Sequence, residues 1–198
     1  MRILVVGATG TIGRAVVAAL GPGNEIVPVS SRSTAITLDL AAPSSIRDMY
    51  RSAGKLDAVV CTAGLAKFAA LGELSDADFR LSLDNKLMGQ VNLVRFGFEH
   101  VADGGSFTLT TGILARSPTR GSAAISLVNA GVEGFVRAAA LEAPRGIRVN
   151  AVSPPWVSET LKALNMDPSQ GLPAATVARA YVRSVTGRDT GATLEPAA

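Results

Sequence analysis

The segment Gly7-Ala8-Thr9-Gly10-Thr11-Ile12-Gly13 follows a short apolar run, Ile3–Val6, and leads into a segment with helical spacing, Thr11–Leu20. Its glycines permit a tight turn and leave backbone N–H groups at the start of a helix open to a phosphate. The G-x-x-G-x-x-G spacing differs from the G-x-G-x-x-G dinucleotide fingerprint but meets the same physical requirement. A turn that merely needs glycine is the alternative. We expect diphosphate contacts from Gly7, Thr9, Gly10, Thr11, Ile12 and Gly13.

The rest of the chain repeats this alternation of short apolar runs and longer segments with helical spacing. The predicted strands are Ile3–Val6, Glu25–Val29, Asp57–Cys61, Ser106–Thr110 and Arg148–Val152. The predicted helices are Thr11–Leu20, Ser44–Ala53, Asp76–Val101 with Ser75 as its N-cap, Ser122–Ala143 and Ala174–Val185. Such alternation predicts an α/β fold, a Rossmann-type doubly wound parallel sheet covered by helices on both faces. With 198 residues, 47% of them hydrophobic, we expect a single domain over residues 1–198.

The composition excludes several kinds of chemistry. One cysteine, Cys61, and one histidine, His100, exclude an internal disulfide and a Cys/His zinc site, so we expect no metal. A Ser-His-Asp hydrolase would have to use His100. The net charge of +3 comes without a Lys/Arg cluster, so we expect no nucleic-acid partner. The apolar run Ile3–Val6 is too short for a signal peptide or a membrane span, which predicts a cytoplasmic protein without a membrane partner.

The end of the second predicted strand indicates which cofactor the chain prefers. Proteins that bind NAD usually carry an acidic residue here, which holds the ribose 2′-hydroxyl. This chain has Ser30-Ser31-Arg32 instead. Hydroxyl groups and a guanidinium suit a 2′-phosphate, so Ser31 and Arg32 predict NADP(H). A solvated arginine at a loop tip is the alternative.

These and further motifs resemble those of the short-chain dehydrogenase/reductase family along nearly the whole chain. Asp39-Leu40 resembles the pair that contacts adenine, and Thr62-Ala63-Gly64 is similar to the family's Asn-Ala-Gly element. Asn85 stands where the family keeps a structural and catalytic asparagine, and Gly146–Pro154 resembles the segment that leads to the nicotinamide. The resemblance implies the family's Rossmann-type fold and its oxidoreductase activity. It also implies cofactor contacts from Asp39, Leu40, Ala63, Gly64 and Pro154.

The catalytic residues of the family do not carry over. Its members use a serine, a tyrosine and a lysine, and the corresponding positions here are Gly112, Ile125 and Asn129. The chain's only tyrosines, Tyr50 and Tyr181, are not followed by the required lysine. Carbonyl reduction needs a proton for the developing alkoxide, which the side chain of Ile125 cannot give. Asn129 can still hydrogen-bond the nicotinamide ribose, so we count it among the cofactor-binding residues.

Other groups are candidates for the missing acid. We name Asn85 and Thr111 as the candidate catalytic residues, since both stand where ligands bind in this family or fold. Thr110, Ser122 and Lys86 are further candidates for the missing acid. The alternative for the threonines is a plain strand residue, that for Ser122 a helix cap and that for Lys86 a solvated charge.

Three functions are compatible with these features. We expect an NADP(H)-dependent short-chain oxidoreductase that transfers a hydride to a small carbonyl, enone or quinone-like substrate with a non-standard proton source. The alternatives are a catalytically degenerate NADP(H)-binding sensor or scaffold, and a glycine loop that serves another nucleotide or a sugar nucleotide. The helices predicted over Asp76–Val101 and Ser122–Ala143 resemble those through which the family dimerises, so we expect a homo-oligomer, a dimer or tetramer.

Overall fold

The computed structural model describes residues 1–197 and has one seven-stranded sheet, in which every pair of neighbouring strands is parallel. The strand order is β3-β2-β1-β4-β5-β6-β7. The strands are β1 (Arg2–Val6), β2 (Glu25–Ser30), β3 (Ile36–Thr37), β4 (Leu56–Cys61), β5 (Val101–Thr110), β6 (Arg148–Val152) and β7 (Thr193–Leu194). The α-helices are α1 (Thr11–Leu20), α2 (Pro43–Ala53), α3 (Asp76–Ser82), α4 (Gly89–Gly97), α5 (Ala123–Glu142), α6 (Ser158–Ala163) and α7 (Ala174–Thr186).

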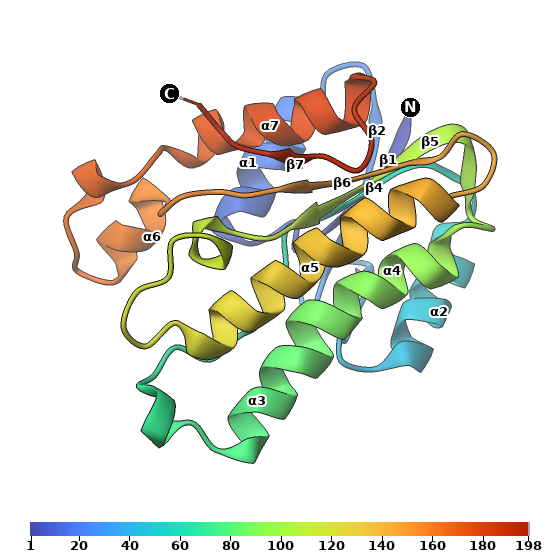
Figure 1. Ribbon diagram of the computed structural model, residues 1–198. Helices are drawn as coiled ribbons and strands as arrows, with labels where there is room; N and C mark the ends of the chain where they lie inside the picture. Colours follow the sequence, from blue (N-terminus) through green and yellow to red (C-terminus); the bar gives the residue numbers. More distant parts are fainter. Residues whose placement is uncertain (198) are drawn as a thin grey trace.

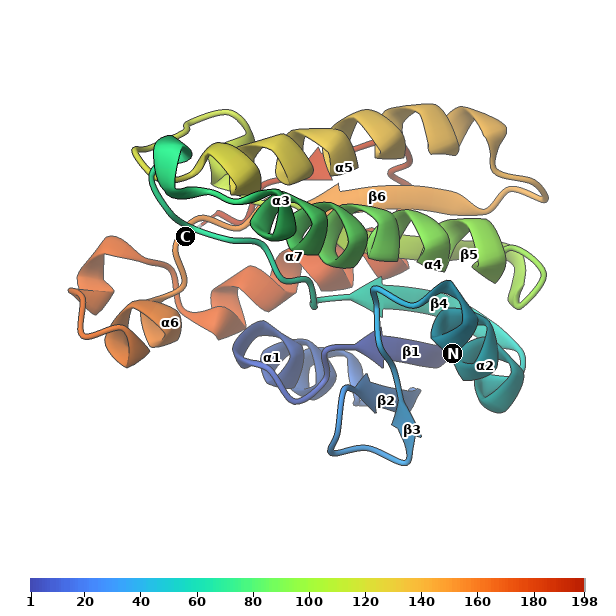
Figure 2. The same ribbon diagram turned by 90° about the horizontal axis from the view of Figure 1, so that it is seen from below.

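Helices cover both faces of the sheet, which confirms the predicted doubly wound fold (Figure 1). Helices α1 and α7 lie on one face, and α2, α4 and α5 lie side by side on the other (Figure 2). Each face has its own apolar core, because the buried strands alternate their side chains between the two layers. Helix α6 lies beyond the carboxyl ends of the strands.

Helix α5 is the one helix within residues 1–197 that is long and apolar enough to cross a membrane by length and composition. Core helices of globular proteins meet the same criterion. The side chains of Val128, Val132 and Val136 are fully buried, and α5 covers the sheet beside α4 (Figure 1). The apolar character of α5 is thus accounted for by its packing in the core.

The prediction of one continuous helix over Asp76–Val101 is wrong. It is divided into α3, a wider π-helical turn over Leu83–Met88, and α4, and Val101 already belongs to β5. Helix α4 ends at Gly97, where an added Cβ would lie 2.5 Å from the Tyr50 Oη. The predicted N-cap is confirmed, since the Ser75 hydroxyl accepts a hydrogen bond from the N–H of Asp78 and the Asp78 carboxylate accepts one from the N–H of Ser75, which together form a capping box.

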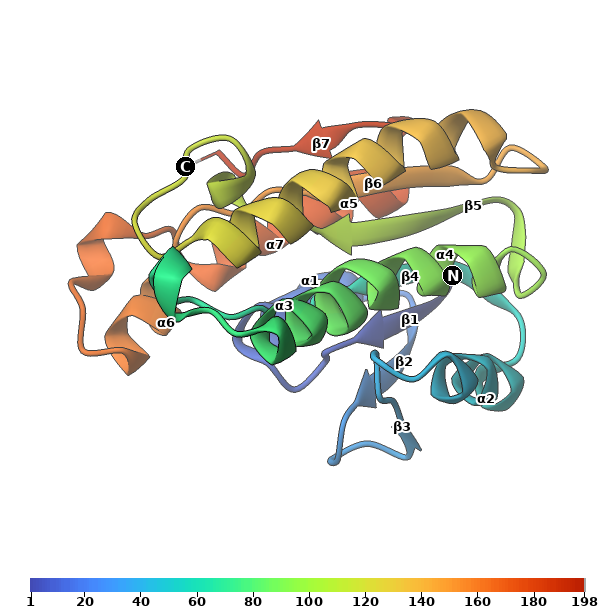
Figure 3. The same ribbon diagram turned by 60° about the horizontal axis from the view of Figure 1, so that its bottom comes forward.

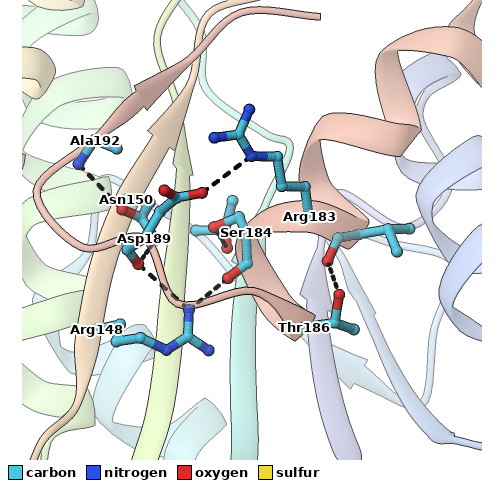
Figure 4. Close-up of polar contacts among 9 residues, drawn as sticks. Arg148, Asn150, Arg183, Ser184, Thr186, Asp189 and Ala192 are labelled. Atoms are coloured by element: carbon cyan, nitrogen blue, oxygen red, sulfur yellow. Dashed lines mark hydrogen bonds and ion pairs between the residues drawn. The ribbon is translucent and has the colours of Figure 1, made fainter.

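Strands β3 and β7 were not predicted, because two residues are too few to show an apolar pattern. They lie at opposite edges of the sheet (Figure 3). Strand β7 is held by polar contacts between β6 and the chain after α7 (Figure 4). The Asn150 side chain donates to the carbonyl of Asp189 at 2.7 Å and accepts from the N–H of Ala192 at 3.1 Å.

Arg148 fixes the end of α7 to the same strand. Its guanidinium donates to the carbonyl oxygens of Ser184 at 2.7 Å and Val185 at 2.8 Å, which lie in the last turn of α7. A cation at a helix C-terminus also interacts favourably with the helix dipole. The contacts of Arg148 therefore position α7, and with it the core beneath that helix.

We expect Arg148→Met to lower the free energy of unfolding by about 2 kcal/mol, because the carbonyl groups of the last turn lose a charged donor. Urea denaturation followed by circular dichroism measures the change. The control is Arg183→Met, which removes an exposed ion pair with Asp189 and should cost less than about 1 kcal/mol. Equal losses in the two variants would contradict the role given to Arg148.

Candidate functional site

A cleft of about 730 Å³ opens at the carboxyl ends of β1, β2 and β4, and we call it the large cleft. The strand order reverses between β1 and β4, which is where open α/β sheets bind ligands. Most of the residues predicted to bind the cofactor line it, so the fold brings together segments far apart in the sequence. These residues are Gly7, Thr9, Gly10, Ser31, Arg32, Asp39, Leu40, Ala63 and Gly64.

The glycine loop brings the start of α1 close to the end of β1. A Cβ at Gly13 would lie 1.9 Å from the carbonyl oxygen of Gly7, so no side chain fits there. Gly7 has a φ of 82°, and its own Cβ would lie 2.8 Å from the Thr62 Oγ1. Thr11, Ile12 and Gly13 form the first turn of α1 and do not line the cleft. No side chain caps α1, so its N–H groups remain available to an anion.

Hydrogen bonds within the turn after β2 leave the guanidinium of Arg32 exposed. The Ser30 hydroxyl accepts a hydrogen bond from the N–H of Ser33 at 3.0 Å, and the Thr34 hydroxyl accepts one from the N–H of Ser30 at 2.8 Å. Ser31 and Arg32 are exposed at the cleft, and Arg32 makes no ion pair with any residue in the range 1–197. An anion in the cleft could therefore bind Arg32 without displacing another partner.

A second cleft of about 220 Å³, the small cleft, adjoins the large cleft at Gly64. It brings together Gly112, Ile125 and Asn129, the positions at which the resemblance implies serine, tyrosine and lysine. Thr111 and Pro154, predicted to be site residues, also line it. The remaining apolar lining consists of Ala66, Ile113, Leu114, Pro155 and Trp156. Pro155 and Trp156 belong to the irregular segment Ser153–Pro173, whose place after a strand predicts a loop over the ligand crevice, whereas no sequence pattern marks the other three.

Asn129 carries an unsatisfied acceptor in this cleft. Its side chain is buried, with 3% of its surface exposed, and its Oδ1 has no hydrogen-bond partner within residues 1–197. Its Nδ2 lies 3.1 Å from where a Cβ on Gly112 would be, so a larger residue at Gly112 would crowd the amide. A buried polar atom without a partner costs about 1–3 kcal/mol, which a ligand that donates a hydrogen bond would recover.

The two candidate catalytic residues already have protein partners. The Asn85 Oδ1 accepts a hydrogen bond from the N–H of Leu65 at 2.7 Å, and Asn85 lines the large cleft. The Thr111 hydroxyl lines the small cleft and lies 3.0 Å from the carbonyl oxygen of Asn129, to which it donates. This geometry gives Asn85 a role in holding the loop after β4. A catalytic role for either residue stays a prediction.

Two other hydroxyl groups considered as acids are held inside the protein. The Thr110 hydroxyl lies 2.5 Å from the carbonyl oxygen of Cys61 and 2.6 Å from the Tyr181 hydroxyl. The Ser122 hydroxyl donates to the carbonyl of Thr119 at 2.7 Å. Neither residue lines the small cleft.

Lys86 differs from the solvated charge that the sequence suggested as the alternative. It is only partly exposed and lines the small cleft. Its side chain runs along Gly64, where an added Cβ would lie 2.9 Å from the Lys86 Cγ. Burial lowers the pKa of the Lys86 ammonium, because the charged form loses hydration.

The side chains of Cys61 and Tyr181 are fully buried, and both are neutral. Burial raises the pKa of the Cys61 thiol to about 11 and raises the pKa of Tyr181 above its ordinary value. Neither group therefore carries a negative charge near neutral pH.

Comparison with known proteins gives matches over most of the chain. A family model described as enoyl-(acyl carrier protein) reductase matches residues 17–194. Hydroxynaphthalene reductase arp2 of Aspergillus fumigatus is 30% identical over 141 residues, which are 69% of this chain and 52% of that protein. The chain thus spans about half the length of the curated relatives it matches.

Solved structures resemble the whole chain. The crystal structure of the protein lin1944 from Listeria innocua is 40% identical, with a TM-score of 0.95 and 98% coverage of both chains. A small-chain dehydrogenase in complex with NADPH is 24% identical, with a TM-score of 0.85 and coverage of 98% of this chain and 95% of that one. The similarity to the small-chain dehydrogenase establishes the fold and nothing further.

We expect the Cys61 thiol to resist modification in the native protein, because it is buried and its raised pKa keeps it protonated at pH 8. Reaction with 5,5′-dithiobis(2-nitrobenzoate), followed by absorbance, measures this. One thiol should react after denaturation in guanidinium and almost none before. Rapid reaction of the folded chain would contradict the burial of the region behind the small cleft.

Proposed function

Since the chain belongs to the short-chain dehydrogenase/reductase family, we propose that it is an oxidoreductase that uses NADP(H). Its substrate is a small carbonyl, enone or quinone-like compound that accepts a hydride. The observation that carries this proposal is the large cleft, which is lined both by Gly10, the N-cap of α1, and by Arg32, which forms no ion pair within residues 1–197. The relative in complex with NADPH supports it at the level of the fold.

The residues present fit the adenosine and diphosphate part of the cofactor. The start of α1 offers N–H groups and a positive helix end to the diphosphate. Ser31 and Arg32 are exposed for the 2′-phosphate, and the carboxylate of Asp39 is at the cleft for the adenine. Leu40 is buried beneath Asp39 and supplies apolar surface.

The small cleft fits the nicotinamide part and the substrate. The unpartnered Oδ1 of Asn129 can accept a hydrogen bond from a ribose hydroxyl. When bound there, the reduced nicotinamide supplies a hydride ion. Ile125 and Trp156 bound the space with apolar surface, which favours a small and mostly apolar substrate. Binding and orientation are the tasks that these side chains perform.

A second candidate function is an NADP(H)-binding sensor or scaffold without turnover. Ile125 favours it, because the position at which the resemblance implies the family's acid has no exchangeable proton. The two candidates share the large cleft and differ in whether any group of the small cleft gives a proton to a substrate.

We expect NADPH to raise the melting temperature more than NADH, because Arg32 can pair with the 2′-phosphate. Arg32→Ala should weaken NADPH binding about 10-fold or more and leave NADH binding almost unchanged. Isothermal titration calorimetry with both nucleotides measures the affinities. The control is Arg51→Ala, which removes an exposed arginine paired with Asp48 on α2. Equal losses for both nucleotides in Arg32→Ala would refute the 2′-phosphate assignment.

We also propose a homo-oligomer that forms through α4 and α5. Both helices lie on the same face of the sheet (Figure 2), and exposed apolar residues, Leu127 and Leu141, lie on α5. The family resemblance implies this pair of helices as the interface.

Light scattering should give a mass of at least twice the 20.3 kDa of one chain. Leu127→Glu should shift the mass towards the monomer, because it places a charge in the proposed interface. Leu164→Glu, an exposed position following α6, is the control and should keep the assembly. A monomeric wild-type protein would exclude the proposed interface.

A further inference from the structure

The small cleft lacks the family's proton donor and has no tyrosine to replace it. The Tyr50 hydroxyl donates to the carbonyl of Leu93 at 2.6 Å, and the Tyr181 hydroxyl contacts Thr110 at 2.6 Å. Both tyrosines are fully buried and neither lines the cleft. Because these are the only tyrosines of the sequence, a phenol cannot supply the proton here.

Lys86 is the one charged residue among those that line the small cleft, and the Thr111 hydroxyl there already donates to the carbonyl of Asn129. Its Nζ makes one long contact, 3.5 Å to the carbonyl oxygen of Thr110, and it forms no ion pair within residues 1–197. An ammonium has three donors, so two of them have no acceptor in the protein. Two other lysines, Lys67 and Lys55, interact with groups outside the small cleft. Lys67 approaches Asp78 at 3.9 Å, and Lys55 donates to the carbonyl of Glu99 at 2.8 Å.

Hydrogen bonds and close packing hold both the backbone and the side-chain stem of Lys86 in place. Gln90, which is fully buried, donates to the carbonyl of Lys86 at 3.1 Å and to that of Thr110 at 2.9 Å. Its Oε1 accepts from the N–H of Thr110 at 2.7 Å. Gly64 leaves room for the side-chain stem, and the π-helical turn over Leu83–Met88 contains the residue itself. Such turns occur frequently at functional sites.

We propose that Lys86 is the proton donor of this enzyme and that it faces the substrate oxygen in the small cleft. The inference rests on the proposed function, because it needs a hydride acceptor bound beside the nicotinamide. It assigns to the π-helical turn over Leu83–Met88 a task that the family resemblance implies for α5.

When NADPH is bound, it would supply a hydride to the carbonyl carbon of the substrate, and the π electron pair of the C=O bond would move to oxygen. Lys86 donates one ammonium proton to that oxygen, which gives the alcohol and leaves a neutral amine. Water from the open cleft returns a proton to the amine. The substrate gains two electrons and the cofactor is oxidised to NADP⁺.

The titratable groups near Lys86 are neutral or paired with other residues, so they do not compete for the proton of its ammonium. Cys61 of β4 and Tyr181 of α7 stay neutral because burial raises the pKa of each. Glu133 of α5 is held by Arg116 at 3.5 Å and by the Thr111 hydroxyl at 3.3 Å. Burial lowers the pKa of Lys86 itself, which brings an amine closer to the range in which it can exchange a proton at neutral pH.

The first test needs no substrate. Reductive methylation with ¹³C-formaldehyde labels the lysines of the wild-type chain, and NMR gives the pKa of each. We expect Lys86 to have a lower pKa than Lys55, Lys67 and Lys162, and we expect only its signal to shift strongly on addition of NADP⁺. An ordinary pKa at Lys86, or a signal unmoved by NADP⁺, would overturn the proposal.

The second test compares two acceptors under NADPH oxidation. Reduction of 2,3-butanedione needs an acid, whereas hydride transfer to menadione yields a stabilised quinol anion that water can protonate. Lys86→Met and Lys86→Arg should lose at least about 100-fold in kcat with the diketone and much less with menadione. Lys55→Met, a distant exposed lysine, is the control. Equal losses with both acceptors would indicate a structural role for Lys86 and refute the proposal.

The pH profile adds a check that a structural role would not reproduce. In the wild type, kcat for the diketone should fall as pH rises through the lowered pKa of Lys86, since the donor is the protonated form. A wild type that reduces menadione but never the diketone would also overturn the proposal. NADPH binding by calorimetry should remain within about 3-fold of wild type in Lys86→Met. Wild type without NADPH binding would instead refute the proposed function.

Discussion

The contact between the start of α1 and the turn before it constrains the rest of the site. Gly13 lies so close to the carbonyl of Gly7 that only a hydrogen atom fits between them. This contact places the N-terminus of α1 next to the large cleft, directly after β1. Thr62, at the end of β4, then contacts the same turn through its hydroxyl group, 3.0 Å from the carbonyl of Val6. The two sides of the strand-order reversal are thereby fixed to one another.

The sequence was sufficient to predict the five longer strands and most of the helices. A strand buried on both faces has a continuous apolar run, which is why Ile3–Val6 is predicted with almost its observed bounds. The division of the segment after Asp76 was missed because helical spacing continues through the π-helical turn. The close packing of Gly97, the last residue of α4, against Tyr50 joins residues far apart in the sequence, so no local pattern reveals it.

The residues of the large cleft were easier to predict than those of the small cleft. Glycines and a terminal arginine after a strand carry a local signal, so the loop at Gly7 and the turn at Arg32 could be identified. The environment of Lys86 has no such signal, because its burial depends on Gly64 and Gln90 from separate segments. A lysine in a polar helical segment ordinarily indicates a solvated charge, and only the tertiary contacts show otherwise.

The two-residue strands β3 and β7 have a consequence for how copies of the chain can meet. An edge strand with a long row of free N–H and C=O groups invites another chain to add a strand to the sheet. Here β3 covers only Val29 and Ser30 of β2, and the uncovered part of β2 contains Pro28, which has no N–H to donate to a new strand. At the other edge, β7 is two residues long, and the polar network around Asn150 and Asp189 holds the chain just before it. Aggregation by strand addition is therefore disfavoured at both ends of the sheet, which leaves the helical faces as the surfaces for self-assembly.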